Sequence, residues 1–112
     1  MLIENSNLEG MTSDLGHLDK ESEKIGFVRW QWEYTRATYD LKFTNGTDEY
    51  FLRFNTRAIE GKLENPDAVL KIEHIYIGRA TFPHGLDYES PVPENILKAA
   101  KGKLEELKQA LA

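Results

Sequence analysis

The chain has 112 residues and a formal net charge of −5, with 40% hydrophobic and 29% charged residues. This composition is typical of a soluble globular protein, and the length fits one domain that spans residues 1–112. The acidic balance disfavours nucleic acid as a partner, because proteins that bind it concentrate Lys and Arg. The absence of cysteine excludes disulfides, thiolate metal sites and cysteine nucleophiles. No signal peptide or apolar run of about 20 residues is visible, so the sequence predicts a cytoplasmic protein with no membrane partner.

The N-terminal quarter predicts a short strand at residues 2–3 and then an amphipathic helix that ends at Ile25. Its apolar stripe consists of Met11, Leu15, Leu18, Ser22 and Ile25. Thr12 or Ser13 can cap the start by accepting from free backbone N–H groups. Gly26 can end the helix in a left-handed conformation.

Period-two alternation then predicts four strands, at residues 28–35, 37–43, 50–58 and about 68–77. In the first strand, Val28, Trp30, Trp32 and Tyr34 are predicted to face the core. Asn45-Gly46 predicts a tight turn between the second and third strands. In the fourth strand the apolar set shifts by one residue after Glu73, which predicts a bulge or a strand end.

Residues 81–93 follow as a segment rich in Pro and Gly, which break both periodicities, and we predict a loop there. A helix of roughly 18 residues then starts near Pro93. Its apolar stripe consists of Leu97, Ala100, Leu104, Leu107 and Leu111.

The predicted order is therefore β-α-β-β-β-β-α. An antiparallel sheet with one apolar face needs a cover, and the two amphipathic helices can supply it. We expect an α+β fold of two layers, in which a curved, mostly antiparallel sheet carries both helices on one face. The first strand is expected at a sheet edge.

Several segments together resemble one protein family. They are Leu8-Glu9-Gly10, Gly26-Phe27-Val28, Trp32 with Tyr34, Phe51-Leu52-Arg53, Ala58-Ile59-Glu60-Gly61 and, above all, Pro83-His84-Gly85-Leu86-Asp87-Tyr88. In this order they are similar to the YugN-like family of small bacterial proteins, over nearly the whole chain. The resemblance implies a two-layer α+β fold similar to the TATA-binding-protein type. It implies no activity, because the family has no assigned catalytic or ligand residues.

The 81–93 loop carries the candidate catalytic residues. His84 can act as a general base near neutral pH, Asp87 can orient it, and Tyr88 or Arg53 can stabilise a developing charge. The competing interpretation is a turn that launches the last helix, in which Asp87 accepts backbone N–H groups and Tyr88 packs on the sheet edge. We favour the turn, because a single His–Asp pair is a weak motif.

The remaining polar candidates are the histidines and the arginines. His17, His74 and His84 fit no local ligand motif, so no metal and no cofactor are predicted. The polar sheet face carries the candidate ligand- or partner-binding residues Arg29, Arg53 and Arg57, since the guanidinium fork suits carboxylate or phosphate, and His84 of the loop is a further candidate. We favour the other interpretation of this face, a solvated surface of cross-strand ion pairs.

A protein partner or a second copy of the chain is the sharper alternative for that face. An exposed apolar patch of Phe27, Phe51, Ile75 and Ile77 would support it. The large aromatic residues are expected to fill the core rather than to line a cavity; they are Trp30, Trp32, Tyr34, Tyr39, Tyr50 and Phe54.

The sequence therefore favours a non-catalytic binding module of the bacterial cytoplasm, for a protein or a small ligand. The alternative is a small enzyme that uses the His84, Asp87 and Tyr88 loop for acid–base chemistry.

Overall fold

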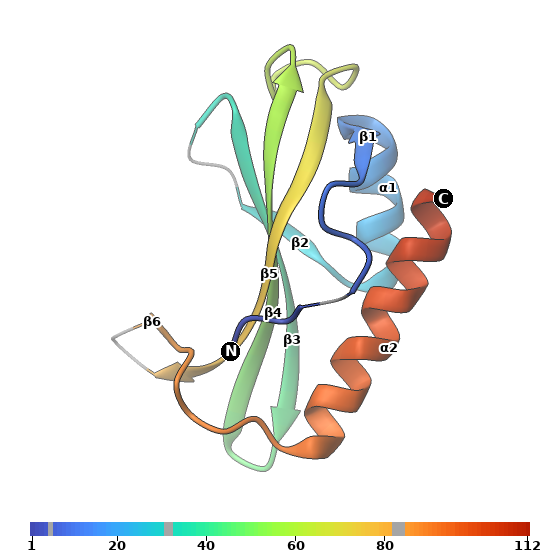
Figure 1. The fold of residues 1–112 in the computed structure, drawn as a ribbon. Helices are drawn as coiled ribbons and strands as arrows, with labels where there is room; N and C mark the ends of the chain where they lie inside the picture. Colours follow the sequence, from blue (N-terminus) through green and yellow to red (C-terminus); the bar gives the residue numbers. More distant parts are fainter. Residues whose placement is uncertain (5, 31–32, 82–84) are drawn as a thin grey trace.

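Both helices lie on the same side of a curved antiparallel sheet, as the sequence predicts (Figure 1). The computed structural model describes residues 1–4, 6–30, 33–81 and 85–112. The elements are β1 (Thr12–Asp14), α1 (Leu15–Ile25), β2 (Val28–Trp30), β3 (Arg36–Asn45), β4 (Asp48–Glu60), β5 (Val69–Thr81), β6 (Gly85–Asp87) and α2 (Glu94–Leu111). The strand order is β1-β5-β4-β3-β2, and β6 also pairs with β5. The implied likeness to the TATA-binding-protein type stays a prediction.

The N-terminal segment runs beside β5, and the first helix begins at Leu15, later than predicted. Leu2 makes an isolated bridge to Tyr76, and Thr12–Asp14 pair with β5 as β1. Asp14 caps α1 in place of Thr12 or Ser13, because its carboxylate accepts from the backbone N–H of His17 at 2.9 Å. Gly26 ends the helix with φ of 118°, a conformation that a side chain would oppose.

The predicted bulge in β5 is confirmed, and it determines where the isoleucines lie. Phe54 pairs with Ile75 whereas Thr56 pairs with Ile72, so β5 holds one residue more than β4 in this interval. The extra residue returns Ile75 and Ile77 to the core, where both are fully buried. The predicted exposed apolar patch is therefore wrong for these two residues.

β2 lies in the opposite phase from the one predicted. Phe27 follows the helix cap directly and is only 3% exposed, with its ring edge-on to that of Phe54 at 5.0 Å. Since side chains alternate along a strand, Val28 and Trp30 then point away from the helices and are exposed. The predicted burial of Trp30 is wrong, and so is the predicted exposure of Phe27.

The other predicted core aromatics divide in the same way. Tyr39, Tyr50 and Phe54 are buried, and the rings of Tyr39 and Phe54 stack with their centroids 4.7 Å apart. Tyr34 is 63% exposed, so its predicted place in the core is wrong. Trp32 lies outside the described residues.

The segment before the last helix is more regular than predicted. Gly85–Asp87 form β6, which pairs with Arg79–Thr81 at the end of β5, so residues 81–93 are not a loop throughout. The 18 residues of α2 start directly after Pro93, as expected. The buried residues of α2 are Ile96, Ala100, Leu104 and Leu107. The helix packs over the sheet beside α1 (Figure 1).

Candidate functional site

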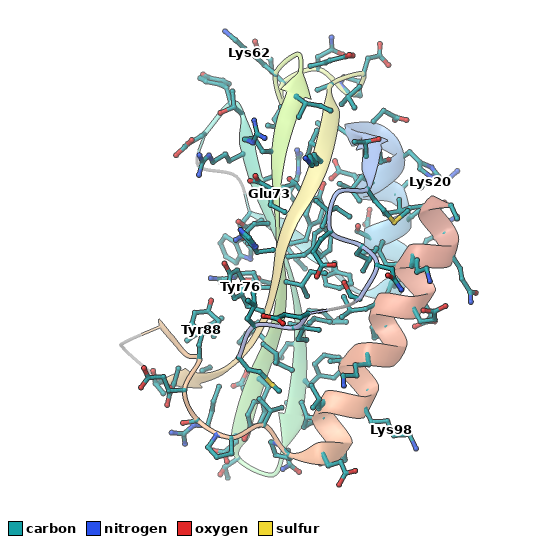
Figure 2. All side chains as sticks on the ribbon, in the orientation of Figure 1. Lys20, Lys62, Glu73, Tyr76, Tyr88 and Lys98 are labelled. Atoms are coloured by element: carbon teal, nitrogen blue, oxygen red, sulfur yellow. The ribbon has the colours of Figure 1, made fainter. Side chains whose placement is uncertain are left out.

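A hollow of about 670 Å³ lies on the sheet face that the helices leave uncovered, which we call the open face. Strands β2, β3 and β4 form its floor and one side, and the end of β5 together with β6 forms the other. Its lining residues are Trp30, Thr38, Asp40, Phe51, Arg53, Ala80, Thr81, Gly85 and Leu86. In Figure 2 the sheet is seen nearly edge-on, and Tyr76 and Tyr88 project on the side of the sheet away from α2.

Arg53 and Asp40 form a bidentate ion pair in the floor of this hollow. Arg53 donates from Nε to Asp40 Oδ1 at 2.7 Å and from Nη2 to Oδ2 at 2.9 Å. The Asp40 side chain is only 8% exposed, whereas that of Arg53 is 33% exposed. The hydrogen bonds to Asp40 raise the pKa of Arg53 above its ordinary value. Asp40 thus fixes the plane of a guanidinium that is still accessible from the hollow.

Tyr88 contacts the nitrogen of the Arg53 guanidinium that Asp40 does not bind. Its hydroxyl oxygen accepts from Arg53 Nη1 at 3.3 Å, and its ring centroid lies 5.5 Å from that of Tyr76. The ring covers Gly78, where a Cβ atom would approach Tyr88 Cδ1 to 2.9 Å and the carbonyl oxygen of Asp87 to 3.1 Å. The absence of a side chain at Gly78 therefore leaves the space that the Tyr88 ring occupies against β5.

Asp87 has the structural arrangement that the turn interpretation predicts. Its carboxylate accepts from the Ser90 hydroxyl and from the backbone N–H of Glu89 at 2.9 Å. The Ser90 hydroxyl is the main cause of a lowered pKa at Asp87, and the Glu89 N–H group adds to it. Arg79 Nη2 lies 3.8 Å from the same carboxylate. His84, the predicted partner of Asp87, lies outside the described residues.

The structure separates the three candidate arginines. Arg57 remains on the open face and pairs with Glu73, Nε to Oε2 at 3.3 Å, as the ion-pair alternative predicts. Arg29 instead points toward α1, because it shares the phase of Phe27, and its Nε lies 3.4 Å from Asp19 Oδ1. The predicted place of Arg29 on the open face is wrong.

Asp19 also receives the hydroxyl of Tyr39, a bond of 2.7 Å that joins α1 to the buried face of β3. Burial, with this carboxylate adding to it, raises the pKa of Tyr39 well above its ordinary value. Tyr39 and Asp19 thus act as a structural tie on the helix side of the sheet.

The histidines of the described part of the chain do not meet. His17 is in the first turn of α1, whereas His74 is exposed on β5 with its ring centroid 6.1 Å from that of Tyr76. Over residues 1–4, 6–30, 33–81 and 85–112, no three His, Asp or Glu side chains gather as a metal ion requires.

Arg53 and Tyr88 were among the predicted candidates for the site, whereas Asp40, Trp30 and Gly78 were not. The predicted Asn45-Gly46 turn would place residue 40 opposite residue 51, but the observed turn is Gly46-Thr47, which places Asp40 opposite Arg53. Trp30 was missed because the phase of β2 was inverted. Gly78 carries no signal, since only the folded chain brings Tyr88 over it.

The fold and the hollow together define a class: a small two-layer α+β protein with a solvent-open pocket on the uncovered face of its sheet. The model of the YugN-like family matches residues 4–111. The chain belongs to the YugN-like family, as the sequence resemblance suggests.

Two relatives show how far the similarity extends. The chain is 31% identical over 109 residues to the uncharacterized protein YlbA of Bacillus subtilis (strain 168), covering 95% of this chain and 91% of YlbA. It is 34% identical to the uncharacterized conserved protein YugN of Geobacillus kaustophilus HTA426, whose crystal structure superposes with a TM-score of 0.87. That superposition covers 99% of this chain and 94% of the other. Neither name gives an activity.

Among the described residues, no helix combines the length and the apolar character that crossing a membrane would take.

Proposed function

We propose that this protein is a non-catalytic binding module of the bacterial cytoplasm that holds a small ligand or a protein partner on its open face. The observation that carries this proposal is the hollow of about 670 Å³, with an oriented ion pair in its floor. Ligand sites of proteins commonly have volumes of about 300–1,000 Å³ and combine apolar walls with a few fixed polar groups.

The exposure of apolar side chains beside the hollow supports the same proposal. Trp30 is 49% exposed and its neighbour Val28 is 60% exposed, both on the edge strand β2. Tryptophan is enriched where proteins bind, since it offers a large rigid surface at small entropic cost. The opposite face of the sheet is covered by α1 and α2, which pack on the hydrophobic core (Figure 2).

The alternative enzyme is not favoured by the geometry around Asp87. The contacts of Asp87 support the turn instead, because Glu89 and Ser90 supply three hydrogen bonds to its carboxylate and so fill most of its acceptor positions. Tyr88 has its hydroxyl on Arg53 and its ring on Gly78, which supports a binding surface instead.

Nuclear magnetic resonance with a ¹⁵N-labelled chain tests this function. Cytosol of the native host is divided into a low-molecular-weight fraction and a macromolecular fraction, and each is added separately. We expect one fraction to shift or broaden the amide signals of Thr38, Arg53 and Leu86, and to leave those of α2 unchanged.

Two variants serve as a matched pair. Trp30→Ala is expected to reduce the shifts, and Lys98→Ala, on the exposed side of α2, is expected to leave them as they are. The proposal is wrong if neither fraction perturbs the open face, or if the perturbed amides lie on the helices.

A further inference from the structure

We propose that the hollow binds a small, planar, uncharged molecule with a carbonyl oxygen, such as an aromatic amide or lactam. This inference rests on the proposed function and names the chemical class of the ligand. The carbonyl oxygen would accept from Arg53, and the flat ring would lie along the apolar walls. Three features of the hollow favour such a ligand: the spacing of its walls, the free donors of Arg53 and the charge of the site.

The walls match a molecule of about two fused rings. Trp30 pairs with Thr38, whereas Phe51 pairs with Lys42, so these two aromatic residues lie on opposite sides of the row that contains Asp40 and Arg53. Each of those rows is two residues from the Arg53 row, about 7 Å along the strands. A bicyclic ring covers that distance on one side of Arg53.

Arg53 has donors left for a ligand. A guanidinium carries five N–H groups. Asp40 takes one from Nε and one from Nη2, and the hydroxyl of Tyr88 takes one from Nη1. Within the described residues, the other two have no protein acceptor. Since Asp40 and Tyr88 hold the group in place, a ligand oxygen meets donors that are already oriented.

The charge of the site favours a neutral acceptor. Arg53 is compensated by the buried Asp40, and no other charged side chain lines the hollow among the residues described. An anion would approach the carboxylate of Asp40 in a chain of net charge −5, and a cation would find both oxygens of Asp40 occupied by Arg53. An uncharged carbonyl oxygen avoids both costs and still gains a charge-assisted hydrogen bond.

The test compares three probes of one shape: 2-naphthamide, 2-naphthoate and 2-naphthylmethylamine, which are neutral, anionic and cationic at pH 7. Each is titrated into the ¹⁵N-labelled chain, and the amide shifts give the dissociation constant and the location. We expect 2-naphthamide to shift the signals of Thr38, Arg53 and Leu86, with a dissociation constant at least about fivefold below those of the charged probes.

Variants assign the contacts. Arg53→Lys keeps a cation beside Asp40 but loses the planar fork, and it is expected to weaken 2-naphthamide at least about fivefold. Arg57→Lys, on the same face, is expected to leave that constant unchanged. Trp30→Ala replaces an exposed residue, so it tests the apolar wall even if Arg53→Lys fails to fold.

Tighter binding of 2-naphthoate or the amine overturns the inference, and so do shifts outside the hollow or no shifts at all. Failure of this inference can be told from failure of the proposed function. A host fraction that still perturbs the open face would keep the binding module and reject only this class of ligand.

Discussion

Replacing Arg53 by Met tests how much the Arg53–Asp40 ion pair contributes to the free energy of unfolding. Met keeps an unbranched apolar chain about as long as the aliphatic part of Arg, so the change removes the donors and the charge but retains most of the packing of that part. It leaves the carboxylate of Asp40, 8% exposed, with neither of its two bonds from Arg53. The free energy of unfolding should fall, because a buried charge is left uncompensated.

The structure sets the size of that loss. Removing one partner of a fully buried pair costs about 3–5 kcal/mol. Arg53 is 33% exposed, so water can reach Asp40 in the variant, and we expect about 2–3 kcal/mol. Arg57→Met is the matched control. Its pair with Glu73 is more exposed, with side chains 44% and 31% accessible, and its loss should stay below about 1 kcal/mol.

Urea unfolding followed by circular dichroism measures both losses. The double variant Asp40→Leu with Arg53→Met should recover most of the stability, because an apolar pair leaves no unpaired charge. If Arg53→Met loses no more stability than Arg57→Met, or if the double variant is no more stable than Arg53→Met alone, the ion pair does not stabilise the fold as proposed.

Three further predictions concern contacts on the two sides of the sheet. Gly78→Ala should lower the free energy of unfolding, measured with urea, by about 1–3 kcal/mol, since its Cβ would meet the Tyr88 ring at 2.9 Å. Gly102→Ala in α2 is the control: its Cβ would meet nothing within 4 Å, so it should raise that free energy by about 0.5–1 kcal/mol. Equal effects of the two variants would contradict the close contact at Gly78. Tyr39→Phe should cost about 1–2 kcal/mol, because it removes a 2.7 Å bond to a carboxylate of α1, and in ultraviolet titration Tyr39 should ionise only when the chain unfolds, since its pKa is raised. The pKa of Asp87 is lowered from 3.8 in the folded chain, so its stabilising effect is present above that value and is lost as the pH falls through the folded-state pKa. Ser90→Ala should therefore raise the midpoint of the Asp87 carboxyl ¹³C titration, and an unchanged midpoint would exclude the hydroxyl as the main cause.

The long strands and the last helix could be predicted from the sequence, because the spacing of their apolar residues is compatible with only one buried face. A turn signal at Asn45-Gly46 and apolar residues at every second position predict the hairpin of β3 and β4, although its turn lies one residue later, at Gly46-Thr47. The phase shift after Glu73 marks the bulge in β5. The 18-residue stripe of α2 determines its length and its buried side. In these elements, pattern and tertiary packing favour the same structure.

The errors fall where a segment is too short for its pattern to decide. β2 has three residues, and either Phe27 or Trp30 could supply its buried aromatic ring. The cap at Gly26 brings Phe27 onto Phe54 and so inverts the phase of the strand. β6 is also three residues long, and it forms only because the end of β5 offers it a partner. Both errors affect the predicted site, since Trp30 of β2 and residues of β6 line the hollow.

If the open face around Arg53 holds a small ligand or a protein partner, as we propose, it is covered in the cell. The chain has no cysteine, so a single introduced thiol reports on one position. Thr38→Cys lies in the hollow and Lys98→Cys lies on α2, and their rates of labelling by a maleimide can be compared in buffer and in native cytosol. We predict that cytosol slows labelling at position 38 several-fold relative to position 98. Equal slowing at both positions, or protection of position 98 alone, would contradict the account.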